Sequence, residues 1–346
     1  MKIYIDVEEK TNHFAYALGD ALTRLGCVVA YGSRLLWEKE VLDYDVVHFQ
    51  WPEGVFGHFK HKVTDEELKR VEERLVFLKR NNKKIFATVH NLEPHTNKNP
   101  NVIKLYDIIY CQAHVIIHMG KFSKDLLSKK YPKATHVIIP HHIYDDIYNF
   151  SYDRNEARNK LGLPIDKDII LCFGKFRNDR ERNFLLDIRR RIDSAVCFVT
   201  PGFYRESLRS KNPIKLIKRI VKTLQYKSKD IKFSNEVIPD DDMQRYFCAA
   251  DVVLIQRPVI LNSGNLPMAY AAGKVVVGPD VGNVGGILRD TNNFVFNPDE
   301  IDTAVMAIHN ALVAAKEGQG SKNRDYAYKE WQSSVIAQRL LKLYSN

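Results

Sequence analysis

Short runs of consecutive apolar residues recur along the chain, separated by segments in which apolar positions repeat at helical spacing. A run that is apolar at successive positions is typical of a strand covered on both faces. Strands of this kind alternating with amphipathic helices indicate a parallel, doubly wound α/β sheet. In the first half the predicted strands are 2–7, 27–32, 45–51, 84–90, 114–119 and 136–142, and the predicted helices are 13–25, 64–81, 101–112 and 121–130.

The same pattern restarts after a polar stretch, which predicts a boundary near residues 145–165. Two α/β domains follow from this reading, over 1–150 and 151–325, with a final helical segment over 326–346. In the second half the predicted strands are 168–174, 194–202, 231–237, 251–256 and 275–280. The predicted helices there are 182–191, two short ones from 241 and 263, then 299–316 and 325–343.

Composition places the chain among ordinary globular proteins, with 346 residues, 45% hydrophobic and 27% charged. No apolar run approaches the roughly 20 residues of a membrane-spanning helix. The N-terminus lacks the long apolar stretch of a signal peptide. The five cysteines are far apart, which fits neither a disulfide framework nor a metal site. These features predict a cytoplasmic protein with free thiols.

The positive charge of the chain favours an anionic partner, since the formal net charge is +10 and the pI is near 9.2. Basic residues concentrate between Tyr204 and Phe233, where Ile214, Ile217 and Val221 recur at helical spacing. A basic amphipathic helix of this kind is typical of peripheral binding to anionic lipid, which predicts contact with the inner membrane surface. The alternative is an ordinary helix that covers the second sheet. Nucleic acid is disfavoured, because no recognisable binding module interleaves these cations with aromatics.

Basic residues also gather just after the predicted strand 168–174. In open α/β sheets, ligands bind beyond the carboxyl ends of the strands. Gly174 permits a tight turn there, and Lys175, Arg177 and Arg180 follow. Cations at a strand end are suited to hold a diphosphate. The alternative is a solvated basic loop.

A second candidate turn precedes the helix predicted from residue 263. Asn262 and Ser263 are suited to cap that helix, and Gly264 allows a ligand to approach the backbone. Unpaired N–H groups at a helix start bind phosphate without a metal. The alternative is a capped helix with no ligand.

Histidines stand at three predicted strand ends of the first half, as His48, His90 and the pair His141 and His142. Neutral imidazoles can bind sugar hydroxyls or transfer protons. The alternative is a structural hydrogen bond for each of them. Metal ligation is disfavoured, because no Glu or Cys stands at ligand spacing.

In their order along the chain, these motifs resemble those of the GT-B glycosyltransferases, and of glycosyltransferase family 4 in particular. The matching segments are DVVHFQWPE, ATVHNLEPH, HVIIPHH, FGKFRNDR, IPDDDMQRYFCAADVVLIQR, SGNLPMAYAAGKVVVGPDVG and YKEWQSSVIAQRLLKLY. The resemblance implies two Rossmann-like domains with a cleft between them. It implies an acceptor site in 1–150, a nucleotide-sugar site in 151–325, and a last helix, 326–346, that crosses back onto the first domain.

The resemblance further implies a retaining transfer without metal or other cofactor, from a nucleotide sugar to a glycan or lipid-linked glycan in polysaccharide biosynthesis. Lys175 and Arg180 match the basic pair at the donor diphosphate, and His90 matches a residue near the transferred sugar. These three are the predicted catalytic residues. The predicted substrate-binding residues are His13, His48, Trp51, Asn91, His95, His141, Gly174, Arg177, Arg257, Asn262, Ser263, Gly264, Asn265 and Leu266.

Two departures from the family pattern leave other functions open. Ile260 and Met268 occupy the places of the usual paired glutamates, the second of which binds the donor ribose. Thr11, Asn12 and His13 replace a glycine-rich first loop. The alternatives are a nucleotide-sugar epimerase or hydrolase of the same fold, and an inactive glycan- or nucleotide-binding relative.

Overall fold

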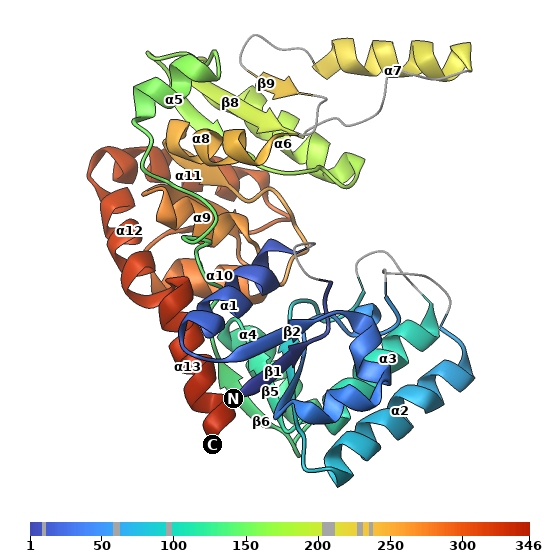
Figure 1. Cartoon of the computed structure of the whole chain (residues 1–346). Helices are drawn as coiled ribbons and strands as arrows, with labels where there is room; N and C mark the ends of the chain where they lie inside the picture. The colour runs from blue at the N-terminus through green and yellow to red at the C-terminus, as the bar shows by residue number, and fades with distance from the viewer. Residues whose placement is uncertain (9–11, 58–62, 95–98, 203–211, 227–230, 235–237) are drawn as a thin grey trace. The chain divides into compact units, whose positions relative to one another are not determined.

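The chain forms two compact units in the computed structural model (Figure 1): Met1–Ile147 with Lys329–Asn346, and Tyr148–Tyr328. We call them unit 1 and unit 2. Each has its own sheet and core. The structure describes residues 1–8, 12–57, 63–94, 99–202, 212–226, 231–234 and 238–346.

Unit 1 contains a six-stranded parallel sheet in the order β2-β1-β3-β4-β5-β6. Its strands are β1 (Lys2–Ile5), β2 (Val28–Tyr31), β3 (Val46–Phe49), β4 (Lys84–Val89), β5 (Val115–His118) and β6 (Thr135–Ile138). Its helices are α1 (His13–Arg24), α2 (Asp65–Arg80), α3 (Pro100–Gln112), α4 (Lys121–Lys130) and α13 (Ser333–Ser345), with short 3₁₀ turns η1 (Ser33–Trp37), η2 (Lys39–Asp43) and η3 (Pro52–Gly54).

The last helix, α13, completes the core of unit 1. Ile336, Leu340 and Tyr344 of α13 are at most 2% exposed and pack with Leu18 and Leu22 of α1. Burying one large apolar side chain contributes about 1.5–3 kcal/mol, so α13 is a substantial part of this core. The chain thus returns to unit 1 after unit 2, as the sequence resemblance implied.

Unit 2 repeats the architecture with a parallel sheet in the order β12-β11-β10-β7-β8-β9. Its strands are β7 (Asp168–Leu171), β8 (Val196–Pro201), β9 (Ile231–Ser234), β10 (Val252–Leu254), β11 (Val275–Pro279) and β12 (Phe294–Phe296). Its helices are α5 (Arg154–Lys160), α6 (Asp179–Arg191), α7 (Pro213–Tyr226), α8 (Asp240–Ala249), α9 (Asn265–Ala271), α10 (Gly282–Asp290), α11 (Ile301–Lys316) and α12 (Gln319–Glu330).

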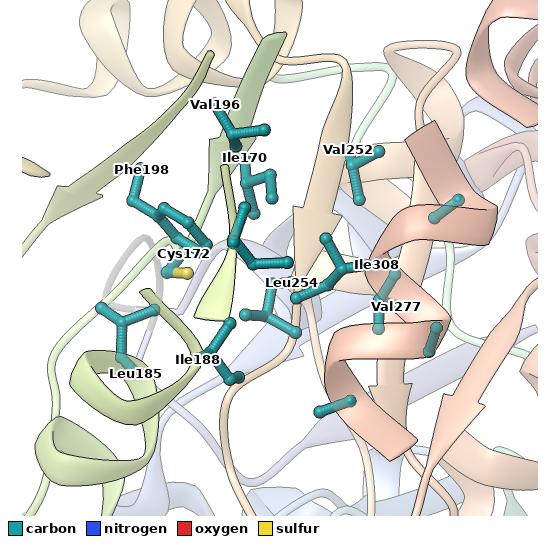
Figure 2. Close-up of a cluster of buried hydrophobic side chains, with 14 of the residues drawn as sticks. Ile170, Cys172, Leu185, Ile188, Val196, Phe198, Val252, Leu254, Val277 and Ile308 are labelled. Carbon is teal, nitrogen blue, oxygen red and sulfur yellow. The ribbon is translucent and has the colours of Figure 1, made fainter. Parts of the chain in front are cut away.

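Helices α6 and α11 bury their apolar faces on the centre of this second sheet. Figure 2 shows Leu185 and Ile188 of α6 and Ile308 of α11 beside the side chains of Ile170 and Leu254. All five are fully buried. This packing confirms the two-unit α/β architecture, because Val- and Ile-rich strands are covered by helices within a closed apolar layer.

The structure contains elements that the apolar pattern did not predict, namely α5, α10, β12 and the 3₁₀ turns. Helix α5 lies in the polar stretch taken as a linker. It is fastened by Arg158, whose buried guanidinium donates to Asp251 Oδ2 at 2.6 Å and to the carbonyl of Ala249 at 2.9 Å. The helix predicted over 325–343 is two helices, because the backbone is extended at Gln332 (φ −56°, ψ 144°).

Within the described residues, no helix is long and apolar enough to cross a membrane. Among the same described residues, no three or more His, Cys, Asp or Glu side chains are grouped so that they could hold a metal ion.

Candidate functional site

The turns that follow β7 and β8 pack closely against each other at the carboxyl edge of the unit 2 sheet. Gly174 and Gly202 follow β7 and β8 with φ values of +98° and +97°, a region that favours glycine. A Cβ at Gly202 would lie 3.0 Å from the carbonyl oxygen of Gly174. The backbone N–H of Phe176 donates to the Gly202 carbonyl at 3.4 Å. The two glycines therefore let the basic segment after β7 cross directly over the carboxyl edge of the sheet.

Two predicted cations, Arg177 and Arg257, interact at this edge, and the backbone of Lys175 contacts Arg257. Arg257, half-buried just beyond β10, donates from Nη2 to the carbonyl of Lys175 at 3.4 Å. Burial and then the charge of Arg177 lower the pKa of the Arg257 guanidinium, while Glu181 acts in the opposite direction. Within the described residues, no carboxylate lies within ion-pair distance of Lys175, Arg177 or Arg257. An anion bound here would relieve the repulsion between the two guanidinium groups.

Glu181 holds the backbone beneath this basic cluster. It is 3% exposed, and its Oε2 accepts from the N–H of Arg177 at 2.8 Å. The side chain of Asn178 caps α6 by accepting from the Glu181 N–H at 2.9 Å. The start of α6 is thereby fixed directly after the basic turn, which orients Lys175 and Arg177 relative to the strand end.

Arg180 points to a different partner from the one that the sequence predicted. Its Nη2 forms an ion pair with Asp299 Oδ1 at 2.8 Å, and both side chains are exposed. Both residues also line a pocket of about 490 Å³ with Phe184 and Pro298. An exposed pair of this kind contributes at most about 1 kcal/mol. A diphosphate bound by the same nitrogen of Arg180 would therefore have to displace Asp299.

The loop before α9 differs from the predicted cap. The N-cap residue is Gly264, with no side-chain capping bond, and the Leu266 N–H donates to the Ser263 carbonyl at 3.2 Å. Asn262 Oδ1 instead accepts from Asn283 at 2.8 Å. The prediction that Asn262 and Ser263 cap this helix by their side chains was wrong. The backbone before α9 also packs closely on the start of α10, since a Cβ at Gly282 would meet the Ile260 carbonyl at 2.3 Å.

The side chains at the start of α9 are occupied in the protein. Asn265 donates from Nδ2 to the carbonyl of Phe173 at 2.9 Å, which ties α9 to the end of β7. Leu266 is 3% exposed, so its side chain packs inside unit 2. Met268 and Ile260, which the sequence resemblance aligns with paired glutamates, are also buried, at 7% and 9%.

Unit 1 contains a stack of aromatic rings at the carboxyl ends of β3 and β4. His90 lies on Trp51 with ring centroids 3.9 Å apart and an angle of 18°, and the edge of Phe14 meets His90 at 4.8 Å. His90 Nε2 lies 2.9 Å from Gln50 Oε1, which can only accept, so His90 carries its proton on Nε2. Burial and then the neighbouring His141 lower the pKa of His90, so its imidazole is neutral at pH 7.

His141 and His142 also pack against Phe14, with ring centroids 4.7 Å from that of Phe14 in each case. His142 donates from Nε2 to the Phe14 carbonyl at 2.9 Å, and His141 donates from Nδ1 to the His142 carbonyl at 2.6 Å. Burial lowers the pKa of His141 to about 3 and that of His142 to about 4. The half-buried His141 therefore stays neutral at pH 7 and is fixed in orientation.

His48 is a core residue, contrary to the prediction that it contacts substrate. It is 0% exposed, and burial lowers its pKa to about 3. Gln50 Nε2 donates to His48 Nε2 at 3.2 Å, which places the His48 proton on Nδ1, 2.6 Å from the Tyr344 hydroxyl. The side-chain amide of Gln50 thus joins His48 to His90. His48 positions His90 through Gln50 and does not reach a ligand itself.

The other predicted residues of unit 1 lie along the same edge. His13 begins α1 and is half-buried, while Asn91 follows β4 and is 9% exposed. His95, and Thr11 of the first loop, lie outside the described residues.

Sequence reasoning missed two acidic residues at this edge. Asp6 follows β1, is 1% exposed, and accepts from the Gln50 N–H at 2.7 Å. Burial raises its pKa to about 8, and the nearby carboxylate of Glu53 acts in the same direction. Tyr106 donates its hydroxyl to Glu53. The rule that ligand-binding residues follow strand ends applies to Asp6, but the strand predicted over 2–7 includes Asp6, whereas β1 ends at Ile5.

The fold is shared with solved glycosyltransferase structures. Sucrose-phosphate synthase from Thermosynechococcus elongatus gives a TM-score of 0.72 at 15% identity, over 100% of this chain and 98% of that chain. HepE of Anabaena in complex with UDP gives 0.71 at 13% identity, over 99% of each chain. The catalytic domain of starch synthase IV from Arabidopsis thaliana, bound to ADP and acarbose, gives 0.71 at 12% identity, over 99% and 98%.

These likenesses establish the fold of the chain. It has the GT-B fold, with two Rossmann-like domains that each contain a parallel six-stranded sheet. No family model matches the sequence, and no curated protein is significantly similar to it.

Proposed function

We propose that the chain is a glycosyltransferase that transfers a sugar from a nucleotide-sugar donor to a glycan or lipid-linked glycan, with retention and without a metal. The observation that carries the proposal is the basic cluster of Lys175, Arg177 and Arg257 at the carboxyl edge of unit 2. The charge of Arg177 acts there on the half-buried Arg257, and among the described residues Glu181 is the carboxylate that acts on Arg257 in the opposite direction. The similar structures of HepE and starch synthase IV hold UDP and ADP, which supports a nucleoside diphosphate as the ligand.

The cluster suits the charge that develops in such a reaction. As the bond between sugar and diphosphate breaks, negative charge grows on the leaving phosphate, and fixed cations stabilise that transition state. Lys175 and Arg257 are assigned this role, and Arg180 joins them by exchanging Asp299 for phosphate. Because the protein supplies this charge, the proposed mechanism requires no metal.

His90 is assigned to the sugar. Its neutral ring is held rigidly by the stack on Trp51 and by Gln50, which suits it to orient a hydroxyl and not to attract a phosphate. The proposed location is the cytoplasm. The five cysteines are free and four are buried, as expected in a reducing compartment.

Replacement of the cluster residues tests the proposal. We expect Lys175→Ala and Arg257→Ala to weaken UDP or ADP binding and to lower nucleoside diphosphate release from nucleotide sugars about ten- to a thousandfold. A hydrogen bond to a charged group contributes about 1.5–3 kcal/mol, and more where water is excluded, and about 1.36 kcal/mol corresponds to a factor of ten. Calorimetry and an assay of diphosphate release over a donor panel measure the two effects.

Lys160→Ala is the matched control, because this exposed lysine ends α5, before β7 begins, and so lies away from the carboxyl edge. His90→Ala should lower turnover and leave nucleotide binding nearly unchanged. Nucleotide binding by the cluster variants equal to that of the Lys160 variant would contradict the assignment. Loss of activity in EDTA would contradict the metal-independent mechanism, and release of an epimerised sugar without acceptor would favour an epimerase.

A further inference from the structure

Helix α7 presents apolar side chains to solvent. Ile214, Ile217, Ile220 and Val221 are 64%, 59%, 42% and 48% exposed. At 3.6 residues per turn these four positions fall within an arc of about 120° on one side of the helix. In Figure 1, α7 (yellow) lies beyond β9, away from the faces of the unit 2 sheet. The apolar side of α7 is therefore uncovered, and the alternative of an ordinary helix covering the sheet is wrong.

A cation borders this apolar row. Lys218 is exposed and falls about 40° beyond Ile214 on the helix surface, while the exposed Lys215 falls about 100° beyond Ile214, toward the opposite face. The first turn of α7 has no acidic residue, and the printed sequence has none from position 211 to 229. A row of apolar side chains bordered by a lysine is complementary to a surface that has anionic groups at the water and apolar chains beneath them. The interface of an anionic lipid bilayer has that structure.

A second copy of the chain fits this face less well. A symmetric contact between two α7 helices would bring the same patch of each chain together, including Lys218 from both. Like charges held so close would repel one another, and no acidic side chain in the first turn of α7 could neutralise them.

We propose that α7 docks unit 2 on an anionic membrane surface, with Ile214, Ile217, Ile220 and Val221 inserted among the lipid chains, Lys218 at the headgroups and Lys215 on the side toward water. Docking does not depend on the proposed transfer activity. It would bring the protein to a surface at which lipid-linked acceptors are found.

Flotation of the whole protein with vesicles tests the proposal. We expect it to bind vesicles of phosphatidylcholine with 30 mol% phosphatidylglycerol, in ~50 mM salt, at least tenfold more strongly than pure phosphatidylcholine. The preference should fall as salt rises, because salt screens charges at this range. The double variants I214S/I217S and K215E/K218E should each reduce binding at least tenfold.

Two controls match these variants. Val313→Ser removes an exposed apolar side chain of α11 that is 57% exposed, and Lys160→Glu reverses one exposed charge. Both should bind vesicles like the unaltered protein, and UDP binding should be the same in all variants, which separates docking from the transfer activity. Equal binding to both kinds of vesicle, or full binding by I214S/I217S, would overturn the proposal. Dissociation of a dimer by I214S/I217S, without vesicle binding by the parent, would assign the face to a second copy.

Discussion

Burial changes the proton affinity of side chains in unit 1 in two opposite directions. The pKa of Asp6 rises to about 8, so its carboxyl is largely protonated at pH 7. The pKa values of His48, His141 and His142 fall to about 3, 3 and 4, so these rings are neutral. Both shifts favour the uncharged form, as expected where water is excluded. The stability supplied by the histidines is complete above about pH 6.5 and is lost as pH falls toward 3–4.

Asp6 should make stability fall as pH rises. Its pKa is higher in the folded chain, so its contribution is complete below about pH 3.8 and is lost as pH approaches 8. Asp6→Asn keeps the shape and the acceptor for the Gln50 N–H but does not titrate. Between pH 5 and 8 we expect the unfolding free energy of the Asp6→Asn variant, relative to that of the unaltered protein, to increase with pH. The increase should be at most about 1.4 kcal/mol per pH unit. Urea unfolding at several pH values measures this.

The exposed Asp125 of α4 provides the control for this experiment. Asp125→Asn should follow the pH profile of the parent protein. An Asp6→Asn profile that also runs parallel to the parent would show that Asp6 is ionised in the folded chain.

The elements that the sequence predicted are those whose apolar pattern is long and continuous. The Val- and Ile-rich strands and the amphipathic helices fall close to their predicted places. Strand β12 has three residues between polar segments, and α10 contains three glycines, which lower intrinsic helix propensity. Their formation depends on packing against β11 and α11, which no local pattern records.

Some residues of the candidate site could be predicted from the sequence, and their contacts could not. The strand-end rule found Lys175 and Arg177, because position in a parallel sheet follows from chain order, and Arg257 was predicted with the family resemblance. It could not show that Arg180 pairs with Asp299, far along the chain, nor that His48 is buried under Tyr344. Contacts of this kind are set by the three-dimensional packing of distant segments.

Helix α13 contacts the hydrogen-bonded residues His48, Gln50 and His90 through Tyr344, whose hydroxyl lies 2.6 Å from His48 Nδ1. Tyr344→Phe leaves the buried His48 Nδ1–H without its acceptor, which should cost about 1–3 kcal/mol of unfolding free energy. Lys342→Ala, an exposed change on the same helix, should alter it by at most about 0.5 kcal/mol. Urea midpoints at constant slope measure both. Equal midpoints for the Tyr344 and Lys342 variants would mean that His48 finds another partner.

On the scale of the whole molecule, two sheets with separate apolar cores are joined into one chain of net charge +10. A ligand that binds the folded form of unit 2 stabilises that unit by mass action, by about 2.7 kcal/mol at 100 times its dissociation constant. This corresponds to about a hundredfold slower exchange for amides that exchange only when the unit unfolds. Ligand-dependent hydrogen exchange therefore reports which unit holds the nucleotide.

We expect saturating UDP or ADP to slow exchange most in unit 2, in β7, β10 and the segments 173–177 and 257–266 that surround the basic cluster. Uridine and adenosine, which lack phosphates, should protect far less, because Lys175, Arg177 and Arg257 act on charge. Lys175→Ala should remove most of the difference between nucleotide and nucleoside. Hydrogen exchange followed by mass spectrometry measures all three comparisons on the intact chain. Protection confined to the strands of unit 1 would contradict a diphosphate site at the carboxyl edge of unit 2, since mass action stabilises the unit that contains the bound ligand.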